Sequence, residues 1–151
     1  ESLPIQDRIN ILGALATLCA RMGCERKLGW VLRKASLCYT VNAQWHLAHD
    51  VLLSAAKYFQ LEVRELEPSR EIQQLLQLPP AGKTHRGRSG WFSLQAMVLD
   101  DLLQYARHMN DAPRVSRYLA YSLPRLCAEP FQGAEAWHVR QRVLAPELSA
   151  I

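Results

Sequence analysis

The sequence has no uncharged apolar run long enough to cross a membrane as a helix. Its most apolar segment, residues 9–20, lies between Arg8 and Arg21 and is shorter than the roughly 18 to 20 residues that span a bilayer. The segment has the length of the apolar part of a secretory signal, but the residues before it, ESLPIQD, are acidic where such a signal is basic. We therefore expect a soluble protein.

Strand patterning and catalytic motifs are also missing. No segment shows the period-two alternation of apolar and polar residues that a strand requires, so the sequence predicts an all-α class. There is no G-x-S-x-G elbow, no HExxH helix and no local Cys/His/Asn signature. The Gly-Lys-Thr triplet at 82–84 imitates the end of a phosphate-binding loop, but Gln77 stands where that loop needs glycine. No strand precedes the triplet either, so we reject nucleotide binding.

Asp100 and Asp101 are the acidic pair that an acid/base mechanism would need to use. Neighbouring residues on a helix diverge by about 100°, so these two carboxylates cannot converge on one substrate atom. We expect both to be solvated. The sequence thus predicts no enzyme, no catalytic residue and no cofactor.

The cysteines and histidines do not have metal-ligand spacing. No CxxC pair exists, and three of the four cysteines fall among apolar helical positions, which favours buried thiols in a reducing cytosolic setting over disulfides or zinc. His46 and His49 are spaced i,i+3 near Asp50, but a metal would need a third ligand that the sequence does not locate. We expect these histidines to be exposed and no metal to be bound. The cysteines are Cys19, Cys24, Cys38 and Cys127.

The chain of 151 residues is basic, with a formal net charge of +4 and a pI near 9.1. Apolar residues make up 49% and charged residues 21%, which excludes wholesale disorder and suits one domain with a substantial core. The charge permits acidic partners, including nucleic acid and a membrane surface. Because the basic residues are scattered and the aromatic residues lie mostly on apolar stripes, we favour a solvated basic surface over nucleic-acid binding.

Apolar residues recur at spacings of three and four, which predicts a series of amphipathic helices. In the first helix Ile11, Leu15, Leu18 and Met22 form a second apolar stripe, so we expect that helix to be buried on two sides. Pro124 predicts a kink or an early stop in the helix that contains it. The predicted helices run from Pro4 to Gly23, from Glu25 to Thr40, from an Asn42 cap to Phe59, from Ser69 to Leu76, from Trp91 to Met109, from Asp111 to Leu126 and from Gly133 to Leu144.

Two of these helix pairs repeat one another. Asn110 lies 87 positions after Gly23, and apolar or small residues match on both sides of the two turns, as Leu28 with Val115 and Ala35 with Ser122. Each copy resembles the core of a tetratricopeptide repeat. Because such short connections leave the helices antiparallel, we predict an α-solenoid of tetratricopeptide-like antiparallel hairpins. The alternative is that any two amphipathic hairpins align this well.

A stretch of prolines, glycines and basic side chains, PPAGKTHRGRSG at 79–90, separates the two pairs and predicts a basic surface loop. It divides one continuous solenoid into residues 1–78, with the first hairpin and the third and short fourth helices, and residues 91–151, with the second hairpin and a terminal helix. The loop supplies the candidate partner-binding residues, which could grip an acidic surface. They are Lys83, His85, Arg86 and Arg88. A solvated, disordered loop is the alternative.

Two segments carry motifs of a known family. In THRGRSGWFSLQAMVLDDLLQYARHMNDAPRVSRYLAYSL, the motifs are a Thr-His-Arg-Gly element with a tryptophan, a Gln-bearing helix, a Leu-Leu to Ala-Arg core, a Met-Asn turn and a Ser-x-Arg-Tyr-Leu helix. They fall on Thr84 to Gly87 with Trp91, on Gln95, on Leu102 to Arg107, on Met109-Asn110 and on Ser116 to Leu119. The second segment, RMGCERKLGWVLRKASLCYTVNAQWHLAHDVLLSAAKYF, has a Gly-x-x-Arg-Lys motif at Gly23 to Ala35, then Trp45 and Leu52-Leu53.

Both segments resemble the large subunit specific to the second transport protein particle (TRAPP) complex, the family that includes the NIK- and IKK-beta-binding protein. Together they cover residues from about 12 to 127. The family pattern lacks the insertion Arg88-Ser89-Gly90, which here separates Trp91 from the His-Arg-Gly element. The resemblance implies a piece of the helical-repeat region of a longer subunit.

That resemblance also implies a function. The family helps to build a vesicle-tethering complex at the Golgi that promotes nucleotide exchange on Rab GTPases, with the exchange chemistry in a core of small subunits. The implied role is a non-catalytic scaffold, cytoplasmic and peripheral at Golgi membranes. Implied partners are other TRAPP subunits, including the adaptor sedlin and the other complex II-specific large subunit, and, through the complex, a Rab GTPase of the late-Golgi or recycling class.

Two other functions remain open from the residues alone. A free-standing tetratricopeptide-like adaptor would bind peptide ends in a groove, with Arg26 or Arg33 facing the peptide. An enzyme or a nucleic-acid binder would show convergent titratable groups or a steep salt dependence of affinity.

Overall fold

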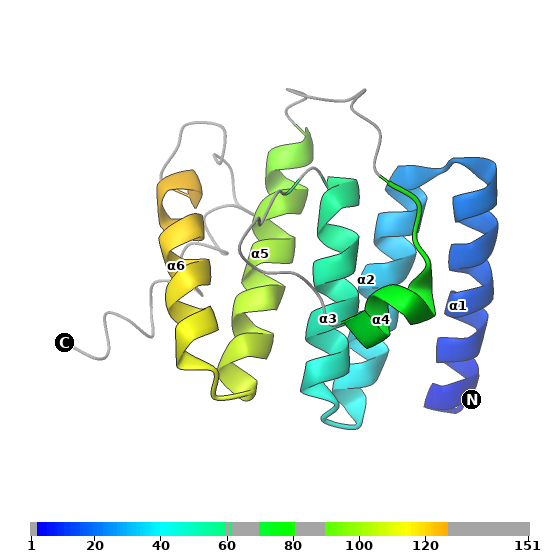
Figure 1. Cartoon of the computed structure of the whole chain (residues 1–151), viewed down its shortest axis with the longest axis horizontal. Coiled ribbons are helices and arrows are strands. Elements are labelled where there is room, and N and C mark those ends of the chain that lie inside the picture. The colour runs from blue at the N-terminus through cyan, green and yellow to red at the C-terminus, as the bar shows by residue number, and fades with distance from the viewer. Residues whose placement is uncertain (1–2, 60, 62–69, 81–89, 127–151) are drawn as a thin grey trace. The chain divides into compact units, whose positions relative to one another are not determined.

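The computed structural model describes residues 3–59, 61, 70–80 and 90–126, and throughout these residues it contains helices and turns but no strand. This result confirms the all-α prediction. The elements are α1 (Ile5–Met22), α2 (Glu25–Val41), α3 (Trp45–Ala55), the 3-10 helix η1 (Ala56–Phe59), α4 (Arg70–Leu76), α5 (Gly90–His108) and α6 (Ala112–Leu126) (Figure 1). They form two units, Glu1–Arg86 and Gly87–Ile151.

Gly23 ends α1 as the sequence predicts. Its φ of 72° is left-handed, a conformation that glycine adopts without a steric cost. This geometry lets the N–H of Gly23 donate to the carbonyl of Ala20 at 3.3 Å and the N–H of Cys24 donate to the carbonyl of Cys19 at 3.0 Å. Carbonyls of the last turn of α1 are thereby satisfied, and α2 starts only two residues later.

The predicted cap of the third helix is wrong. Asn42 ends α2, with a φ of −99°, while α3 begins at Trp45 and has no side-chain cap. The turn between them is closed by the backbone, because the N–H of Ala43 donates to Thr40 at 3.0 Å and the N–H of Gln44 donates to Tyr39 at 3.1 Å. Ala43, with a φ of 55°, takes the left-handed position that Gly23 takes after α1.

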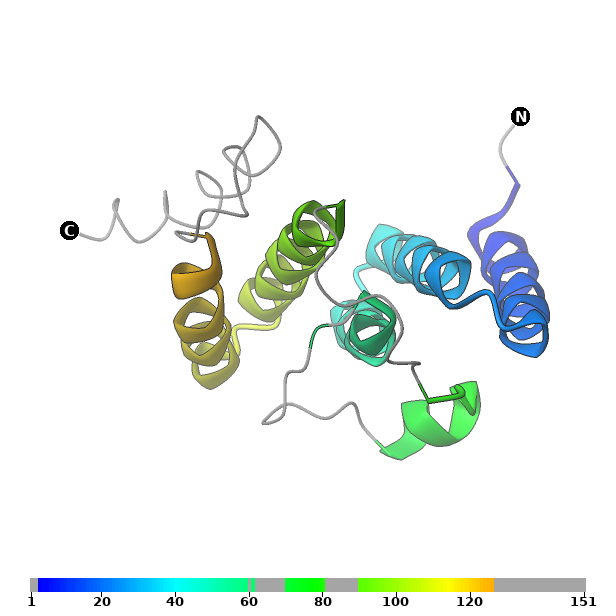
Figure 2. The ribbon, with the colours of Figure 1, turned by 90° about the horizontal axis from the view of Figure 1, so that it is seen from above.

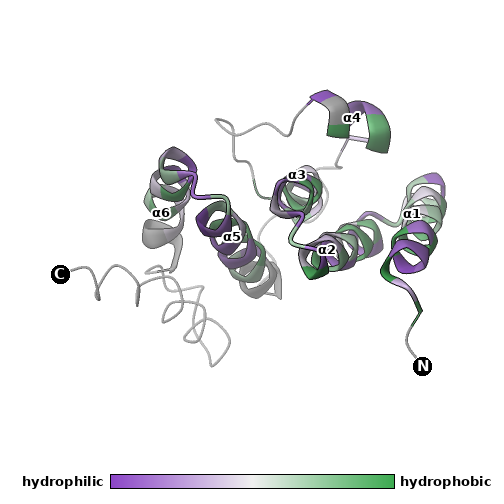
Figure 3. Cartoon of the chain, turned by 90° about the horizontal axis from the view of Figure 1, so that it is seen from below, coloured by the Kyte–Doolittle hydropathy of each residue, from purple (hydrophilic) through white to green (hydrophobic). Residues whose placement is uncertain are grey.

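In the first unit α2 packs against both α1 and α3, and consecutive helices run in opposite directions (Figures 1 and 2). Both α1 and α2 carry hydrophobic and hydrophilic residues (Figure 3), and the buried apolar residues form the core of the unit. α3 is buried nearly all round from Ala48 to Ala55. The fully buried side chains at the centre include Leu28, Leu52, Tyr58 and Phe59.

Gly29 allows α2 to approach η1 closely. A methyl group at this position would lie 3.1 Å from two ring atoms of Phe59 and 3.2 Å from the Cβ atom of Tyr58, which is closer than ordinary van der Waals contact. The ring of Phe59 is held on another side by Trp30, whose ring lies edge-on at a centroid distance of 6.1 Å and an angle of 84°. A side chain at position 29 would therefore force a buried ring to move.

The short helix predicted before the prolines is confirmed as α4, which packs against α3. Leu61 before it and Ile72 within it are buried. The hydroxyl of Tyr58 donates a hydrogen bond to the carbonyl of Pro79, 21 positions along the chain. This bond and the two buried side chains hold the segment 70–80 onto the first unit.

The second unit contains α5 and α6 as an antiparallel hairpin (Figure 1). Asn110 makes the turn with a φ of 54°. The carboxylate of Asp111 accepts the backbone N–H of Arg114 at 3.2 Å and lies 3.5 Å from the Nε atom of the same arginine, which anchors the start of α6. α6 continues two residues beyond Pro124. The predicted terminal helix, 133–144, lies outside the described residues.

The two turns of the internal repeat have the same backbone geometry. Gly23 and Asn110, 87 positions apart, are both left-handed, and each joins two helices that pack on each other. The small residues Ala35 and Ser122 are buried in their respective hairpins, as close helix packing requires. The boundary between the two units falls within 79–90, and the continuity of one solenoid across it stays a prediction.

Candidate functional site

The four candidate partner-binding residues of the sequence lie outside the described residues. Lys83, His85, Arg86 and Arg88 belong to the segment 81–89, so their role stays a prediction. The described residues offer other candidates, which come from the surface and the hollows of the first unit.

The histidine pair of α3 is divided between surface and core. His46 is exposed as expected, but His49 is fully buried, and its Nδ1 atom lies 2.9 Å from an Oδ1 oxygen of Asp50. The prediction that both histidines are exposed is wrong because α3 is covered on nearly all sides. In the part of the chain that the structure describes, no group of three His, Cys, Asp or Glu side chains could hold a metal.

The prediction that Asp100 is solvated is also wrong. Asp100 is buried instead of solvated, and it accepts a hydrogen bond from Gln104 at 3.3 Å. Its neighbour Asp101 is half-buried. The reason is that α5 is buried on more than its apolar stripe, so that Gln95 is buried as well.

The thiols are placed much as the sequence suggests. Cys19 is a buried free thiol, and Cys24 and Cys38 are half-buried free thiols. Cys127 lies outside the described residues. Cys19 on α1 and Cys38 on α2 act here as small apolar side chains, and Cys24 lies in the turn between these helices.

A hollow of about 620 Å³ lies on the side of the first unit that carries α4. Side chains of α1, α2 and α3 line it, and Leu75–Leu78 line it from α4 and the residue pair after it. Gly13 and Thr17 face it from α1, and Tyr39 faces it from α2. The hollow is mixed in polarity, and the segment after α3 already occupies one wall.

Burial tunes the ionisable groups of η1 toward their neutral forms. It raises the pKa of the Tyr58 phenol, and the negative charge of Glu25 raises the same pKa further. Burial also lowers the pKa of Lys57, whose Nζ atom lies 5.2 Å from the centre of the Tyr58 ring. The raised pKa keeps the Tyr58 phenol protonated at neutral pH, so it can donate its hydrogen bond to Pro79 and hold the segment 70–80 on the first unit.

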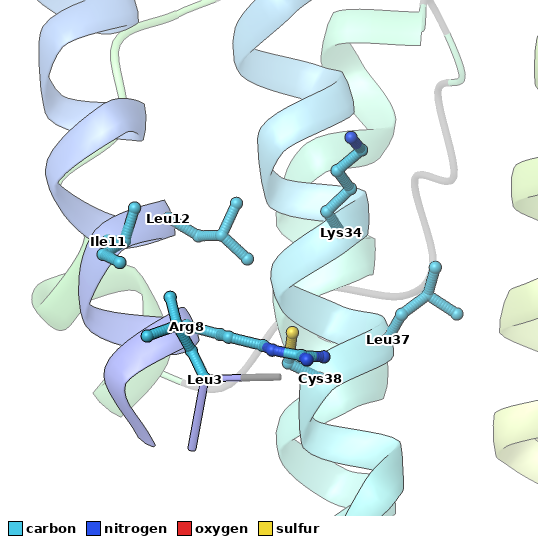
Figure 4. A pocket seen from close by; sticks show the side chains of 7 residues that line it. All are labelled: Leu3, Arg8, Ile11, Leu12, Lys34, Leu37 and Cys38. Carbon is cyan, nitrogen blue, oxygen red and sulfur yellow. The ribbon is translucent and has the colours of Figure 1, made fainter. Parts of the chain in front are cut away.

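A second hollow, of about 370 Å³, opens between α1 and α2 (Figure 4). The side chain of Arg8 extends from α1 toward Cys38 on α2, and Lys34 stands further along α2 (Figure 4). Neither cation has an ion pair within the described residues. The lining consists of Leu3, Arg8, Ile11, Leu12, Lys34, Leu37 and Cys38.

The second apolar stripe of α1 is exposed, contrary to the expectation of burial on two sides. Ile11, Leu15, Leu18 and Met22 are 54%, 41%, 52% and 68% exposed. We call these four residues the α1 ridge. Periodicity correctly identified the ridge as apolar, but it could not show that none of the described elements packs against it.

The side chains of the two hollows define the chemistry that this surface offers. Across the described ranges, the two hollows contain no nucleophile hydrogen-bonded to a base and no group of convergent titratable side chains. None of the helices in the described part combines the length and the hydropathy that crossing a bilayer takes. The smaller hollow offers a partner apolar contacts, with the basic side chains of Arg8 and Lys34 beside them.

Comparison with known protein families places the chain in a family of helical repeats. The family model described as "Trs120/TRAPPC9 TPR" matches residues 1–128, which span both helical hairpins. No curated protein and no solved structure matches the chain.

Proposed function

This chain belongs to the Trs120/TRAPPC9 TPR family, and from that membership we propose that it is a non-catalytic scaffold segment of a TRAPP-type vesicle-tethering complex. The observation that carries the proposal is the extent of the match, which covers residues 1–128 and so includes both hairpins of the repeat. TPR denotes the tetratricopeptide repeat, a module whose stacked helix pairs present extended surfaces to other proteins.

The structure of the first unit agrees with a scaffold role. Its interior is closed by apolar packing and by one anchoring hydrogen bond from Tyr58. Most of its exposed large apolar residues lie on helix surfaces, and Arg8 and Lys34 stand at the smaller hollow, where both sets are accessible to another protein. A helical body with exposed apolar and basic residues can bind partner proteins without performing a reaction.

The finer part of the proposal follows the family resemblance. The complex is the second TRAPP complex, which acts at the Golgi and promotes nucleotide exchange on a Rab GTPase of the late-Golgi or recycling class. In this proposal the chain contacts sedlin and the other complex II-specific large subunit. It supplies no catalytic residue to the exchange reaction, and it is cytoplasmic and peripheral at the membrane.

The test is affinity purification of the tagged chain from cells. We expect TRAPP subunits to co-purify with it, and an unrelated helical-repeat chain of similar size and charge to recover none of them. Recovery of no TRAPP subunit with the tagged chain would overturn the proposal.

A separate measurement tests the non-catalytic part. The isolated chain should not accelerate nucleotide release from a Rab GTPase, whereas the assembled complex should. Acceleration by the chain alone would contradict the assignment as a scaffold.

The hollow of about 620 Å³ favours a second candidate, a peptide-binding adaptor. Arg26 and Arg33 do not line that hollow, and Arg33 instead lies over the ring of Trp30 at 5.6 Å. The residue to change is therefore Tyr39, which does line it. Loss of peptide affinity in Tyr39→Ala, with no loss in Arg33→Ala, would favour the adaptor.

A further inference from the structure

The α1 ridge has a covered counterpart within the same chain. The positions 87 residues after Ile11, Leu15 and Leu18 are Val98, Leu102 and Tyr105 on α5. These three counterparts are all buried, whereas the three ridge residues are about half exposed. The matching face of the repeat is therefore one that packs, and on α1 the described elements leave it open.

The ridge fits a helix rather than an extended strand. Its residues are spaced four, three and four positions apart, and the rise of 1.5 Å per residue makes the ridge about 17 Å long. This length matches about three turns of a helix lying along α1. Helices pack by setting such ridges into one another's grooves.

The second hollow extends the ridge toward α2 and adds charge. Ile11 belongs to both features, and Leu12 and Leu37 continue the apolar lining. Arg8 and Lys34 stand at the hollow from its two sides (Figure 4). At 100° per residue, Asp7 and Arg21 lie on the opposite flank of the ridge. That flank therefore carries one charge of each sign, whereas the flank toward α2 carries Arg8 and Lys34.

The charge of this surface excludes two occupants. A second copy of the chain docked ridge to ridge would bring a second Arg8 and Lys34 into the interface, so the cations of the hollow would add to one another instead of being neutralised. The described hairpin helix α6 carries Arg114, Arg117 and Arg125 and no acidic residue, so it is unsuited for the same reason. The surface calls for a negatively charged partner.

We propose that the α1 ridge and the adjoining hollow dock an acidic amphipathic helix of another protein. The apolar stripe of that helix lies on Ile11, Leu15, Leu18 and Met22, and one apolar side chain enters the hollow between α1 and α2. Carboxylates on one flank of the helix pair with Arg8 and Lys34. The cations then set orientation and on-rate, while the apolar contacts supply the affinity.

The probe is a synthetic peptide of about 16 residues, long enough to form the three turns required. It has leucines spaced four, three and four positions apart and glutamates on one flank. A matched peptide has lysines in place of the glutamates. Binding of each fluorescent peptide to the full chain is measured by anisotropy at low and high salt. We expect the acidic peptide to bind, the lysine peptide to bind at least tenfold more weakly, and the acidic peptide to lose affinity in salt.

Variants locate the site. Lys34→Glu alone and Arg8→Glu/Lys34→Glu together should weaken binding of the acidic peptide, the double variant by about tenfold. Leu18→Gln should weaken both peptides because it removes apolar contact. Lys27→Glu is the matched control, since Lys27 is exposed on α2 and does not line the hollow. It should bind like the wild type, and circular dichroism should be the same for all variants.

Three results would overturn the inference. The acidic peptide fails to bind, or it binds Lys34→Glu and the double variant as tightly as the wild type. Alternatively, the chain forms dimers that Leu18→Gln abolishes, which would make a second copy the occupant. This assay uses a synthetic probe, so its outcome is independent of the TRAPP purification.

Discussion

Gly29 provides the sharpest test of how α2 packs on η1. Replacing Gly29 by alanine places a methyl group 3.1 Å from Cε2 and Cζ of Phe59 and 3.2 Å from Cβ of Tyr58. Ordinary van der Waals contact begins at 3.4 Å, so each of these contacts is too short by a few tenths of an ångström. Phe59 is fully buried and packed edge-on against Trp30, which leaves its ring little room to move.

Two opposing terms set the size of the effect. Alanine in a helix interior is favoured over glycine by about 0.5–1 kcal/mol. Overpacking a well-filled core costs about 1–3 kcal/mol. The second term is larger because the neighbours are a buried ring and a second buried side chain. We expect Gly29→Ala to lower the free energy of unfolding by about 1 kcal/mol.

Gly13 is the matched control. It lies in the interior of α1, and a methyl group there would meet no atom within 4 Å. Gly13→Ala should therefore show the helix term alone and raise the free energy of unfolding by about 0.5–1 kcal/mol. The two variants should differ by about 2 kcal/mol, or about 4–8 °C in melting temperature for a chain of this size.

The assay is thermal and urea unfolding of the full chain followed by circular dichroism. If Gly29→Ala and Gly13→Ala raised the melting temperature equally, the ring of Phe59 would have to yield freely. The close approach of α2 to η1 would then not be a constraint on the fold, and our account of the position would fail.

Further substitutions test the turn, the anchor and the second hairpin. Gly23→Ala should lower the free energy of unfolding by about 1–2 kcal/mol, because φ is 72° and no atom lies close enough for a clash to contribute; urea unfolding measures it. Tyr58→Phe should cost about 1 kcal/mol at neutral pH through loss of the bond to Pro79. Burial raises the pKa of Tyr58 from 10.0 in the folded chain, so above about pH 10 the unfolded chain loses the phenol proton first. The free energy of unfolding of the wild type should therefore fall as the pH rises further, and that of Tyr58→Phe should fall less. The lowered pKa of Lys57 acts in the opposite direction but in both proteins, so the comparison of unfolding curves against pH isolates Tyr58. Ser122→Ala should be neutral or raise the melting temperature, because the buried Oγ atom has no hydrogen-bond partner among the described residues.

The sequence predicts the helices well because the signals that begin and end a helix are local. Gly23 and Asn110 end helices at the expected positions, and α4 ends at Leu76 before the two prolines. Such signals depend on the backbone of a few neighbouring residues. Asn42 shows their limit, since the turn there is closed by backbone groups and its left-handed residue is Ala43.

Burial is harder to predict because it depends on how many neighbours a helix has. His49 and Asp100 have polar side chains, yet both are buried because α3 and α5 are covered beyond their apolar stripes. The α1 ridge is the converse case, with an apolar face that no described element covers. Periodicity reports the chemistry of a face, while its exposure is decided by tertiary packing. The two hollows could not be predicted for the same reason.

The bond from Tyr58 to Pro79 has a consequence for the order in which the first unit assembles. The contacts between α1 and α2 and between α2 and α3 join segments that are adjacent in the chain, and local contacts of this kind form early during folding. The bond from Tyr58 to Pro79 instead joins the first unit to a segment whose described helix, α4, has only seven residues. A helix this short is not stable by itself, so the segment 70–80 should close after the hairpins and, in native-state hydrogen exchange, open before the helices beneath it.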